Sequence, residues 1–500
     1  MGIIFRQSAK STLVNLAATF MGFISLVFIY PYNFEYYSIF QAIFSNAYII
    51  LPFLGLGING AIIKFYPIFR EKSLDKELLP FFLLLASITT IVGTLILGLI
   101  YVSFKSALFH IFPNLHKVES HWLMIIVMAW ILNFSIIFLY YCNAKLRIVI
   151  PDLLYNASLK FVLPILILLS YLWSVSLDTF KTWILIYYVL ILVLLIVYAI
   201  NLDSIKWKVP KSLDKSLKQS IMNFMGYSTL NGLGATLALR IDMVMIGALL
   251  NLESVGVYAY LLTISNVMDL PSKSLNQISA PVISKNWTEN DFKNIQDVYT
   301  KSAILGGAIS MGLFLLIYAV WPYVLDLIPS GKIPEGLLNS GMILLILGIA
   351  RVIDIVTGVN NLILSYSKLY KYNLYFLLFL AAINITMNYF LIKDYGMVGA
   401  ATSTLVSYFI YNVIKYIFVR HNFGFNLPLK SIAGMMLWFA ACIILISKVH
   451  LSFHPILNIM IIGTFISILF GIGIWILNPY NLIQDMVKDA LKNLNIFQKK

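Results

Sequence analysis

The sequence predicts an all-α membrane protein with about fourteen transmembrane helices. Fourteen apolar stretches run through the 500 residues, and little chain lies between them. Each is long enough to cross a bilayer core, which takes roughly 20 residues, and a backbone in lipid must pair its amides within the segment. Charged residues make up only 11% of the chain, against 60% hydrophobic, which leaves too little polar surface for a soluble domain of this size.

The predicted spans follow one another along the whole chain. They cover residues 12–31, 38–60, 79–103, 122–141, 153–172, 182–200, 222–249, 255–273, 302–321, 338–363, 372–392, 397–418, 431–448 and 456–477. The first span is expected to remain as a helix. Its apolar run from Leu13 to Tyr30 is longer than the core of a signal peptide, and no small-x-small cleavage site follows it.

The distribution of lysine and arginine predicts the orientation. With the N-terminus on the cytoplasmic side, the cytoplasmic segments hold 25 of these cations, the opposite loops hold 6, and four fall within spans. Cytoplasmic loops of membrane proteins carry such an excess. Both termini are therefore predicted to be cytoplasmic, and the net charge of +14 is interpreted as an orientation signal.

An internal repeat predicts two lobes. Ser11–Thr19 can be laid over Ser228–Thr236, an offset of 217 residues that covers six spans. A repeat of six spans restarts on the same side of the membrane, so the halves would be related by a pseudo-two-fold axis along the membrane normal, with a central cleft. We expect pseudo-symmetric six-helix lobes at 1–205 and 206–425. Two additional helices and a cytoplasmic tail would follow at 426–500.

Several other classes of protein are disfavoured. The cations are spread over short loops with no folded domain to present them to nucleic acid. Cys142 and Cys442 are far apart and give neither a disulfide framework nor a metal-ligand spacing, and His110, His116 and His121 share a loop without tight spacing. We find no nucleophile–base set, so a transporter without a cofactor is predicted rather than an enzyme.

Three segments, taken in order, resemble one family of membrane transporters. They are Leu54–Pro67, then Arg240–Gly247 with Ser254–Tyr258, then Asn384–Asn388 with Tyr395–Thr404. In this combination they resemble the polysaccharide-transporter branch of the multidrug/oligosaccharidyl-lipid/polysaccharide (MOP) exporter superfamily.

The resemblance implies a flippase of the bacterial cytoplasmic membrane. Its substrate would be a lipid-linked oligosaccharide, usually on an undecaprenyl pyrophosphate carrier, for surface polysaccharide such as the O-antigen of lipopolysaccharide. The implied partners are this substrate and membrane lipids, with polysaccharide-assembly proteins as further candidates. One feature departs from a related branch: lipid II flippases carry arginines in their first helix, whereas residues 12–34 here contain no charge. A neutral cavity would suit sugar binding by Tyr, Asn and Ser.

Arg351 is a candidate substrate-binding cation. It lies near the middle of span 338–363, where a charge costs roughly several kcal/mol unless it meets a cavity or a partner. Asp354 follows at i+3 on the same face. Two interpretations stay open. One is a structural ion pair within the helix, and the other is a guanidinium that faces the cavity and binds the carrier's pyrophosphate bidentately, tuned by Asp354.

Three more charged residues inside spans are candidates for the cavity: Arg240, Asp242 and Lys160. Arg240 and Asp242 are two residues apart, so they point to different faces of one helix. Lys160 either snorkels to the interface or adds positive charge to the first lobe. Asp269 is predicted to be an interfacial residue at a helix break. Asp242, Asp269 and Asp354 are all candidates to carry a coupling proton or sodium ion, and the sequence does not choose among them.

Other polar residues and glycines are predicted to be structural. Asn384 and Asn388, four apart, share a face and are expected to make interhelical hydrogen bonds. Lys64 and Lys415 are interpreted as anchors at the cytoplasmic interface. The conspicuous glycines are expected to permit close helix approach rather than to act as hinges; they are Gly55, Gly57, Gly60, Gly396 and Gly399.

Two alternative functions stay open. A multidrug or cation antiporter of the multidrug and toxin extrusion (MATE) type would use the same fold, but such antiporters typically have twelve helices. A membrane glycosyltransferase or polysaccharide polymerase would usually need a large external loop or acidic residues at an external helix mouth. The first external loop has only Glu35, and the longest external loops, 104–121 and 322–337, are short.

Overall fold

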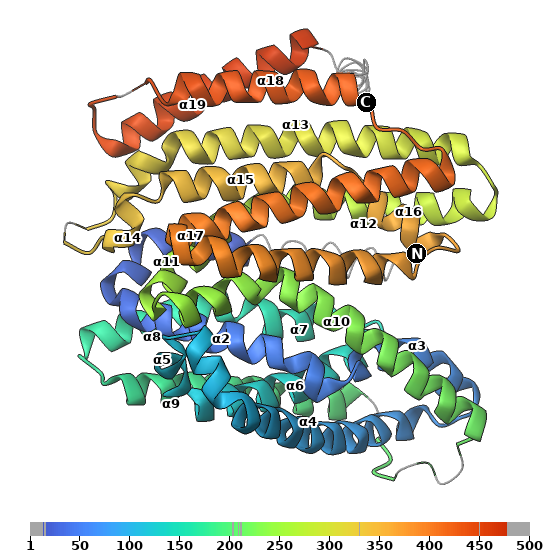
Figure 1. Cartoon of the computed structure of the whole chain (residues 1–500). Helices are drawn as coiled ribbons and strands as arrows, with labels where there is room; N and C mark the ends of the chain where they lie inside the picture. Colours follow the sequence, from blue (N-terminus) through green and yellow to red (C-terminus); the bar gives the residue numbers. More distant parts are fainter. Residues whose placement is uncertain are drawn as a thin grey trace, which may run out of the picture. The chain divides into compact units, whose positions relative to one another are not determined.

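The regular secondary structure of the computed structural model is entirely helical, with no strand among the residues that it describes (Figure 1). These are residue 14 and residues 17–202, 205–208, 210, 213–329, 331–449 and 451–477. Among them, ten helices are long and apolar enough to cross a membrane, or eleven if one bent pair counts as a span. The all-α membrane fold predicted from the sequence is confirmed, and the number fourteen stays a prediction.

The helices follow in this order. After a short apolar helix at Ala17–Phe28 come η1 (Tyr30–Asn33), α2 (Phe34–Gly55), α3 (Ile58–Glu71), α4 (Asp75–Ile111), α5 (Leu115–Glu119), α6 (Trp122–Ala144), α7 (Val149–Asp152), η2 (Leu153–Ala157), α8 (Leu159–Leu172), α9 (Leu177–Leu202), α10 (Lys215–Leu249), α11 (Leu252–Ser265), η3 (Asn266–Met268), α12 (Asp269–Thr288), α13 (Phe292–Leu325), α14 (Glu335–Leu338), α15 (Gly341–Ile355), α16 (Asn360–Tyr366), α17 (Tyr372–Phe423), α18 (Leu429–Ile446) and α19 (Pro455–Leu477).

The structure has fewer long helices than predicted spans partly because α17 covers two of these spans. This helix runs for 52 residues, which as one straight helix would measure about 78 Å, far more than a bilayer core of roughly 30 Å. Gly396 interrupts it with φ 58° and ψ −136°, between the predicted spans 372–392 and 397–418. Among the described residues, a Cβ at Gly396 would meet Leu250 alone within 4 Å, at 3.9 Å. Close approach is therefore the wrong explanation for this glycine, which is suited to the site by its positive φ.

A second predicted span is also broken in the structure. The stretch 338–363 forms α15 and α16, which are bent by 43° at the intervening residues. Gly358 has φ +63° there, and a Cβ on it would lie 2.7 Å from Ser302 Oγ. The amide of Val359 donates to the same Oγ at 3.2 Å, so α13 holds the break in place.

The chain divides into two compact units. Unit 1 comprises Met1–Ala259 and Asn384–Gly396, and unit 2 comprises Tyr260–Ile383 and Met397–Lys500. The two lobes predicted at 1–205 and 206–425, and the two additional helices and tail predicted at 426–500, stay predictions. Of the two segments that suggested the repeat, residues 11–13, 15 and 16 lie outside the described part of the chain.

In unit 1, α2 packs against α4, α6 and α10. The predicted span 38–60 is two helices here, because Leu56 and Gly57 adopt left-handed conformations (φ 39° and 71°) between α2 and α3. A Cβ at Gly57 would lie 2.5 Å from the carbonyl oxygen of Met225 on α10. A Cβ at Gly55 would lie 2.7 Å from Asn133 Oδ1, and one at Gly60 would lie 2.6 Å from Ser228 Oγ, so close helix approach is confirmed for these three glycines.

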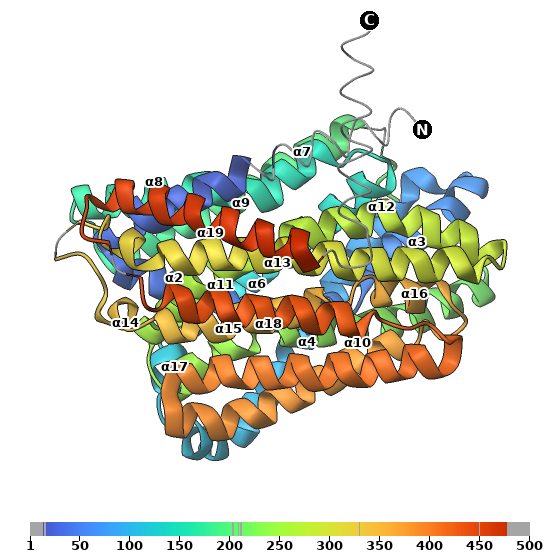
Figure 2. The same cartoon turned by 90° about the horizontal axis from the view of Figure 1, so that it is seen from above.

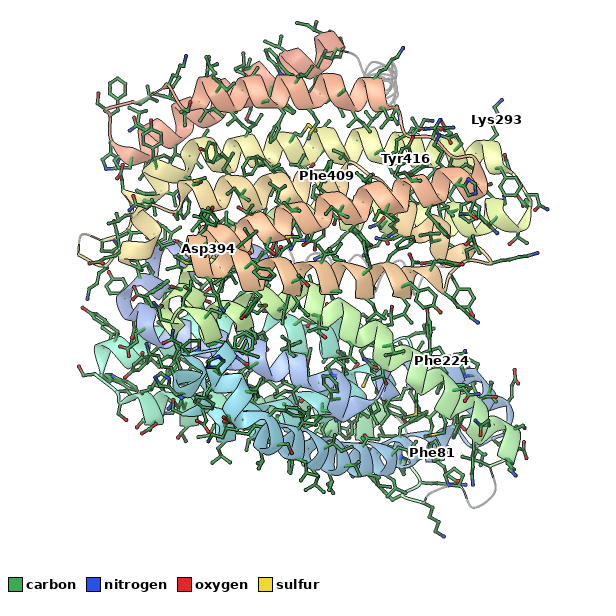
Figure 3. The ribbon with its side chains drawn as sticks, in the orientation of Figure 1. Phe81, Phe224, Lys293, Asp394, Phe409 and Tyr416 are labelled. Atoms are coloured by element: carbon green, nitrogen blue, oxygen red, sulfur yellow. The ribbon has the colours of Figure 1, made fainter. Side chains whose placement is uncertain are left out.

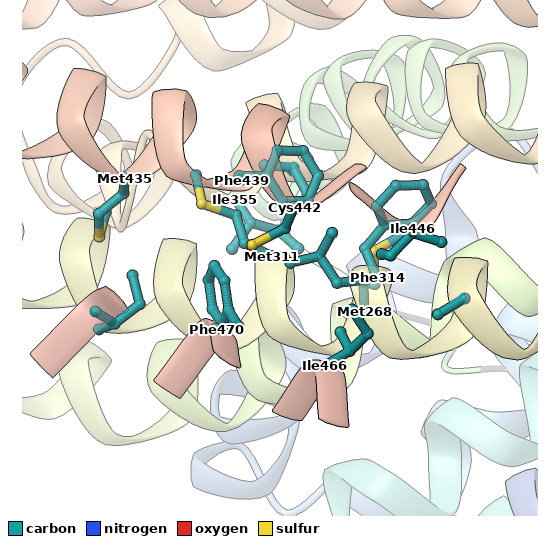
Figure 4. Close-up of a cluster of buried hydrophobic side chains, with 14 of the residues drawn as sticks. Met268, Met311, Phe314, Ile355, Met435, Phe439, Cys442, Ile446, Ile466 and Phe470 are labelled. Atoms are coloured by element: carbon teal, nitrogen blue, oxygen red, sulfur yellow. The ribbon is translucent and has the colours of Figure 1, made fainter. Parts of the chain in front are cut away.

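In unit 2, α13 packs against α12, α15, α18 and α19 (Figures 1 and 2). The last two helices contribute directly to its core, where apolar side chains of α13 meet those of α18 and α19 (Figure 4). The labelled members of this cluster are Met268, Met311, Phe314, Ile355, Met435, Phe439, Cys442, Ile446, Ile466 and Phe470. The C-terminal helices are thus an integral part of unit 2.

Candidate functional site

Arg240 of α10 is held in unit 1 by aromatic rings. Its guanidinium carbon lies 5.1 Å from the centroid of the Phe44 ring and 5.3 Å from that of Tyr48, both on α2. Within the described ranges no carboxylate lies within 4.0 Å of it, and its five N–H groups have no hydrogen-bond acceptor. Among the described residues, the positive charge meets the ring faces of Phe44 and Tyr48.

A group of tyrosines extends from Tyr48 to η2 and α9. The hydroxyls of Tyr48 and Tyr155 (in η2) are 3.2 Å apart, and the hydroxyl of Tyr187 on α9 is 2.7 Å from Ser158 Oγ. The ring of Tyr188, also on α9, lies 6.5 Å from Phe44, and its buried hydroxyl has no hydrogen-bond partner in the described part of the chain. The group offers phenolic hydroxyls, which both donate and accept hydrogen bonds.

A neutral cavity of about 130 Å³ adjoins the tyrosines. Tyr48 lines it, and so does Thr236, which is one helical turn before Arg240. Its lining holds neither an acid nor a base: Tyr48, Leu51, Pro52, Gly55, Gly57, Ile58, Asn59, Asn133, Ile136, Ile137, Ser228, Thr229, Gly232 and Thr236. Hydroxyls and amides alternate here with small and apolar side chains.

Asp242 faces away from Arg240, as their spacing predicts. Its carboxylate is buried and accepts hydrogen bonds from the Tyr258 hydroxyl at 3.0 Å and from Asn388 Nδ2 at 2.7 Å. Asn388 Nδ2 also donates to Asn384 Oδ1 at 2.6 Å. The interhelical hydrogen bond predicted for Asn388 is therefore confirmed, and its partner on α10 is a carboxylate.

Lys160 lies on α8 and is partly buried in unit 1. Its Nζ donates to Thr19 Oγ1 of the first apolar helix at 3.2 Å. The side chain thus reaches a hydroxyl of a neighbouring helix.

Arg351 of unit 2 has an acidic neighbour on another helix. Its Nη1 lies 3.9 Å from Asp269 Oδ2 on α12 and donates to the Tyr408 hydroxyl at 3.4 Å. Asp354 is occupied elsewhere, because its Oδ1 accepts from Asn412 Nδ2 at 3.0 Å. Among the described carboxylates, Asp269 and not Asp354 lies within ion-pair distance of Arg351.

The burial of Lys415 contradicts the role of interfacial anchor that was predicted for it. Its side chain is fully buried, and its Nζ donates to Asn361 Oδ1 and to the Tyr411 hydroxyl. Lys415 Nζ lies 2.9 Å from the Tyr411 hydroxyl oxygen. Asn412, next to Tyr411, accepts from Thr357 Oγ1 at 3.1 Å. The side chains of α17 therefore bond Thr357, within the break between α15 and α16, and Asn361, at the start of α16.

Sequence reasoning missed this polar face of α17, although a signal was present. Tyr408, Tyr411, Asn412 and Lys415 follow the i, i+3, i+4, i+7 spacing of one helix face inside an apolar span. Phe409 comes one residue after Tyr408, so it lies on another face of the helix, and its side chain is 54% exposed. In the part of the chain that the structure describes, no three His, Cys, Asp or Glu side chains are close enough to share a metal ion.

Comparison with known proteins confirms the resemblance to the MOP superfamily. Residues 228–390 match the model of the MatE family. A curated relative, the "Probable low-salt glycan biosynthesis flippase Agl15" of Haloferax volcanii, is 21% identical over 279 residues. That match spans 55% of this chain and 57% of the relative, so the chain is matched to little more than half of that protein.

Two solved structures show the same fold. One is a lipid II flippase, MurJ, in an inward closed conformation, with a TM-score of 0.70 and 14% identity over 92% of this chain and 97% of the other. Another is an inward-facing MATE family transporter of the MOP superfamily, with a TM-score of 0.62 and 15% identity over 83% of this chain and 94% of the other. At these identities the likeness establishes the fold.

Proposed function

We propose that this protein flips a lipid-linked oligosaccharide across the cytoplasmic membrane for surface polysaccharide biosynthesis. The carrier would be an undecaprenyl pyrophosphate or a similar polyprenyl phosphate, and transport would proceed by alternating access between two lobes. Both termini would be cytoplasmic. The proposal is supported by the MOP fold and by the flippases among its relatives.

The observation that carries the proposal is the neutral polar cavity of unit 1. Asn59, Asn133, Ser228, Thr229 and Thr236 line it without any charged neighbour in the lining. Hydroxyl and amide groups match the donors and acceptors of a sugar, whereas the lining offers an organic cation no carboxylate and a single aromatic ring, that of Tyr48. At about 130 Å³ the cavity is smaller than a usual ligand pocket, so it would hold only part of a glycan in this conformation.

We further propose Asp242 as the first choice among the ion-coupling candidates. It is a buried carboxylate joined to α11 and α17 through Tyr258 and Asn388. Its protonation, or its binding of a sodium ion, would alter hydrogen bonds that link three helices. Asp269 and Asp354 are less suited, because Asp269 lies near Arg351 and Asp354 accepts from Asn412.

Deletion of the gene tests the function. We expect the surface polysaccharide to disappear while the completed lipid-linked repeat unit accumulates in the inner leaflet. Accumulation of incomplete sugars would instead support a glycosyltransferase or polymerase and would contradict the proposal.

A MATE-type antiporter is the second candidate, favoured by the MatE match over residues 228–390. The same deletion strain separates the two functions. An antiporter predicts greater sensitivity to cationic drugs with an unchanged surface glycan. A flippase predicts unchanged sensitivity to cationic drugs and loss of the surface glycan. The control is the deletion strain that carries the intact gene on a plasmid.

A further inference from the structure

We propose that a pocket between α2, α4 and α6 of unit 1 binds an acyl chain of a bilayer phospholipid with an ethanolamine headgroup, and that Lys105 and Glu119 bind that headgroup. This lipid stays bound to the protein. The inference therefore goes beyond the proposed function and does not depend on which substrate is transported.

The pocket lies among three helices that pack against one another and are each long and apolar enough to span a membrane (Figure 1). Its volume is about 270 Å³, near the lower end of ordinary ligand pockets, so it accommodates part of one chain. All three helices contribute apolar side chains to the lining, among them Ile50, Leu54, Leu97, Ile125 and Ile126. Gly98 also lines it, and a Cβ there would meet no described atom within 4 Å. The pocket is therefore open beside this glycine.

The two small polar side chains of the lining bond within the protein. Asn46 Nδ2 donates to the carbonyl oxygen of Ala42 at 2.9 Å. Thr94 Oγ1 donates to the carbonyl oxygen of Thr90 at 2.7 Å and accepts from Trp130 Nε1 at 3.0 Å. Because these groups already have partners, the pocket favours an apolar occupant.

The surroundings of the pocket indicate where such an occupant comes from. Leu95 and Leu99 flank the lining residues Leu97 and Gly98 along α4, and both are exposed. Exposed apolar side chains of a membrane-spanning helix face the hydrocarbon core of the bilayer. The acyl chains of bilayer lipids are therefore the apolar molecules that lie beside this part of α4.

A charged and aromatic cluster lies beyond the pocket, towards the end of α4. Trp122 lines the pocket, and its ring packs on that of Tyr101 with centroids 3.8 Å apart. The Tyr101 hydroxyl and Lys105 Nζ both donate to Glu119 Oε1, each at 2.6 Å. The Lys105 and Glu119 side chains are 50% and 31% exposed. One cation and one anion are thus accessible next to aromatic rings, as is common at a membrane interface.

The spacing along α4 fits a phospholipid. Lys105 follows Gly98 by seven residues, which is about 10 Å along a helix axis. Half of a hydrocarbon core measures roughly 15 Å. A lipid whose phosphate contacts Lys105 can therefore bring one acyl chain alongside Gly98.

The carboxylate of Glu119 selects the headgroup. The ammonium of an ethanolamine headgroup can donate to Glu119 while its phosphate accepts from Lys105, so both charges are matched. A choline headgroup has no N–H to donate. A glycerol headgroup brings a phosphate without a cation, which leaves Glu119 unmatched.

The test is native mass spectrometry of the full-length protein titrated with phosphatidylethanolamine. Gly98→Phe should weaken binding by about ten-fold, because it excludes at least two methylene groups of the chain from the pocket. Leu99→Phe is the matched control, because Leu99 is next in sequence and exposed but does not line the pocket, and it should bind like the wild type. Gly98→Leu, a smaller addition, gives the same test if Gly98→Phe does not fold.

The headgroup is tested with phosphatidylglycerol as the competing lipid. The wild type should prefer phosphatidylethanolamine, and Glu119→Gln should reduce this preference by about three-fold. Lys117→Gln, which changes an exposed charge on the same short helix α5, should leave the preference unchanged.

Three results would overturn the proposal. Equal affinities of Gly98→Phe and Leu99→Phe would show that the pocket binds no chain. Equal affinities of the wild type for the two phospholipids would remove the ethanolamine assignment. Tighter binding of undecaprenyl phosphate than of phosphatidylethanolamine, lost in Gly98→Phe, would assign the pocket to a polyprenyl chain.

Discussion

The Arg351 guanidinium lies 3.9 Å from the carboxylate of Asp269, on a different helix, although Asp354 is one turn away on its own helix. Asp269 begins α12 directly after the turn η3, and this break aims its carboxylate at α15. The pair therefore ties α12 to α15, and Asp354 is left to bond Asn412 of α17. Asp269 therefore links α12 to α15, whereas Asp354 links α15 to α17.

This pairing predicts the result of charge removal at Arg351. Arg351→Gln should lower the amount of protein in the membrane, because it leaves Asp269 without its cation; breaking a buried pair costs about 3–5 kcal/mol, and less here since the Asp269 side chain is 26% exposed. The double variant Arg351→Gln with Asp269→Asn should recover most of the loss. Arg351→Gln with Asp354→Asn should not.

Protein level and surface glycan should be measured together for these variants. Recovery of both in the Asp269 double variant would assign Arg351 a structural role. Recovery of the level without the glycan would make Arg351 a candidate substrate ligand again. Equal rescue by either acid substitution would contradict the pairing.

Asp242 is expected to determine ion coupling. Asp242→Asn keeps two hydrogen-bond partners within reach, Tyr258 and Asn388, so the fold should persist while the titratable charge is lost. Flipping assayed in vesicles should then no longer respond to an imposed proton or sodium gradient. Asp354→Asn is the matched control and should keep the response. A response that survives in Asp242→Asn would exclude this residue.

Lys415 is expected to be inaccessible to water-soluble reagents. It is 0% exposed, whereas Lys64, which the sequence placed in the same class, is exposed beside Phe224. Amine labelling of inside-out vesicles followed by mass spectrometry should therefore modify Lys64 but not Lys415. Labelling of both lysines to a similar extent would show that the α17 polar face opens to water.

Gly256 is expected to tolerate no side chain. A Cβ there would lie 2.9 Å from the Cα of Ser38 and closer still to its side chain, so Gly256→Ala should destabilise the protein by about 1–3 kcal/mol. Gly226→Ala on α10 is the control, because a Cβ at that position would meet no described atom within 4 Å and alanine favours a helix over glycine by roughly 1 kcal/mol. The thermal unfolding midpoint should fall for the first variant and stay or rise for the second.

Cysteine labelling tests the predicted orientation. Lys117→Cys in the external loop should react with an impermeant reagent applied outside, and Lys293→Cys should not. Both side chains are exposed, and Figure 3 shows Lys293 at the periphery near the start of α13. The native Cys142 and Cys442 are buried and should give little background. The reverse labelling pattern would invert the topology.

Other positions suit this labelling experiment less well. Asn114, in the same external loop as Lys117, bonds the carbonyl of Leu249 through its side chain, so its replacement would disturb a contact. Ser330 and Lys211, which would serve as further external and cytoplasmic positions, lie outside the described residues.

Much of the fold was predictable from the sequence by itself. Apolar length and the pairing of backbone amides in lipid require helices, so the class and the approximate positions of the spans follow from composition along the chain. Spacing along a helix also predicted that Arg240 and Asp242 face apart, and that Asn388 bonds another helix. These properties depend on local periodicity, which a sequence displays directly.

The partners of the charged residues were decided only by the tertiary structure. Whether Arg351 meets Asp354 or Asp269 depends on a helix break in another part of the chain, and the burial of Lys415 depends on the bend between α15 and α16. The absence of an acidic neighbour at Arg240 in the described residues likewise follows from which rings of α2 pack there. Hydropathy determines that a segment crosses the membrane, but the energy of a buried charge depends on what neighbouring helices bring within a few ångströms.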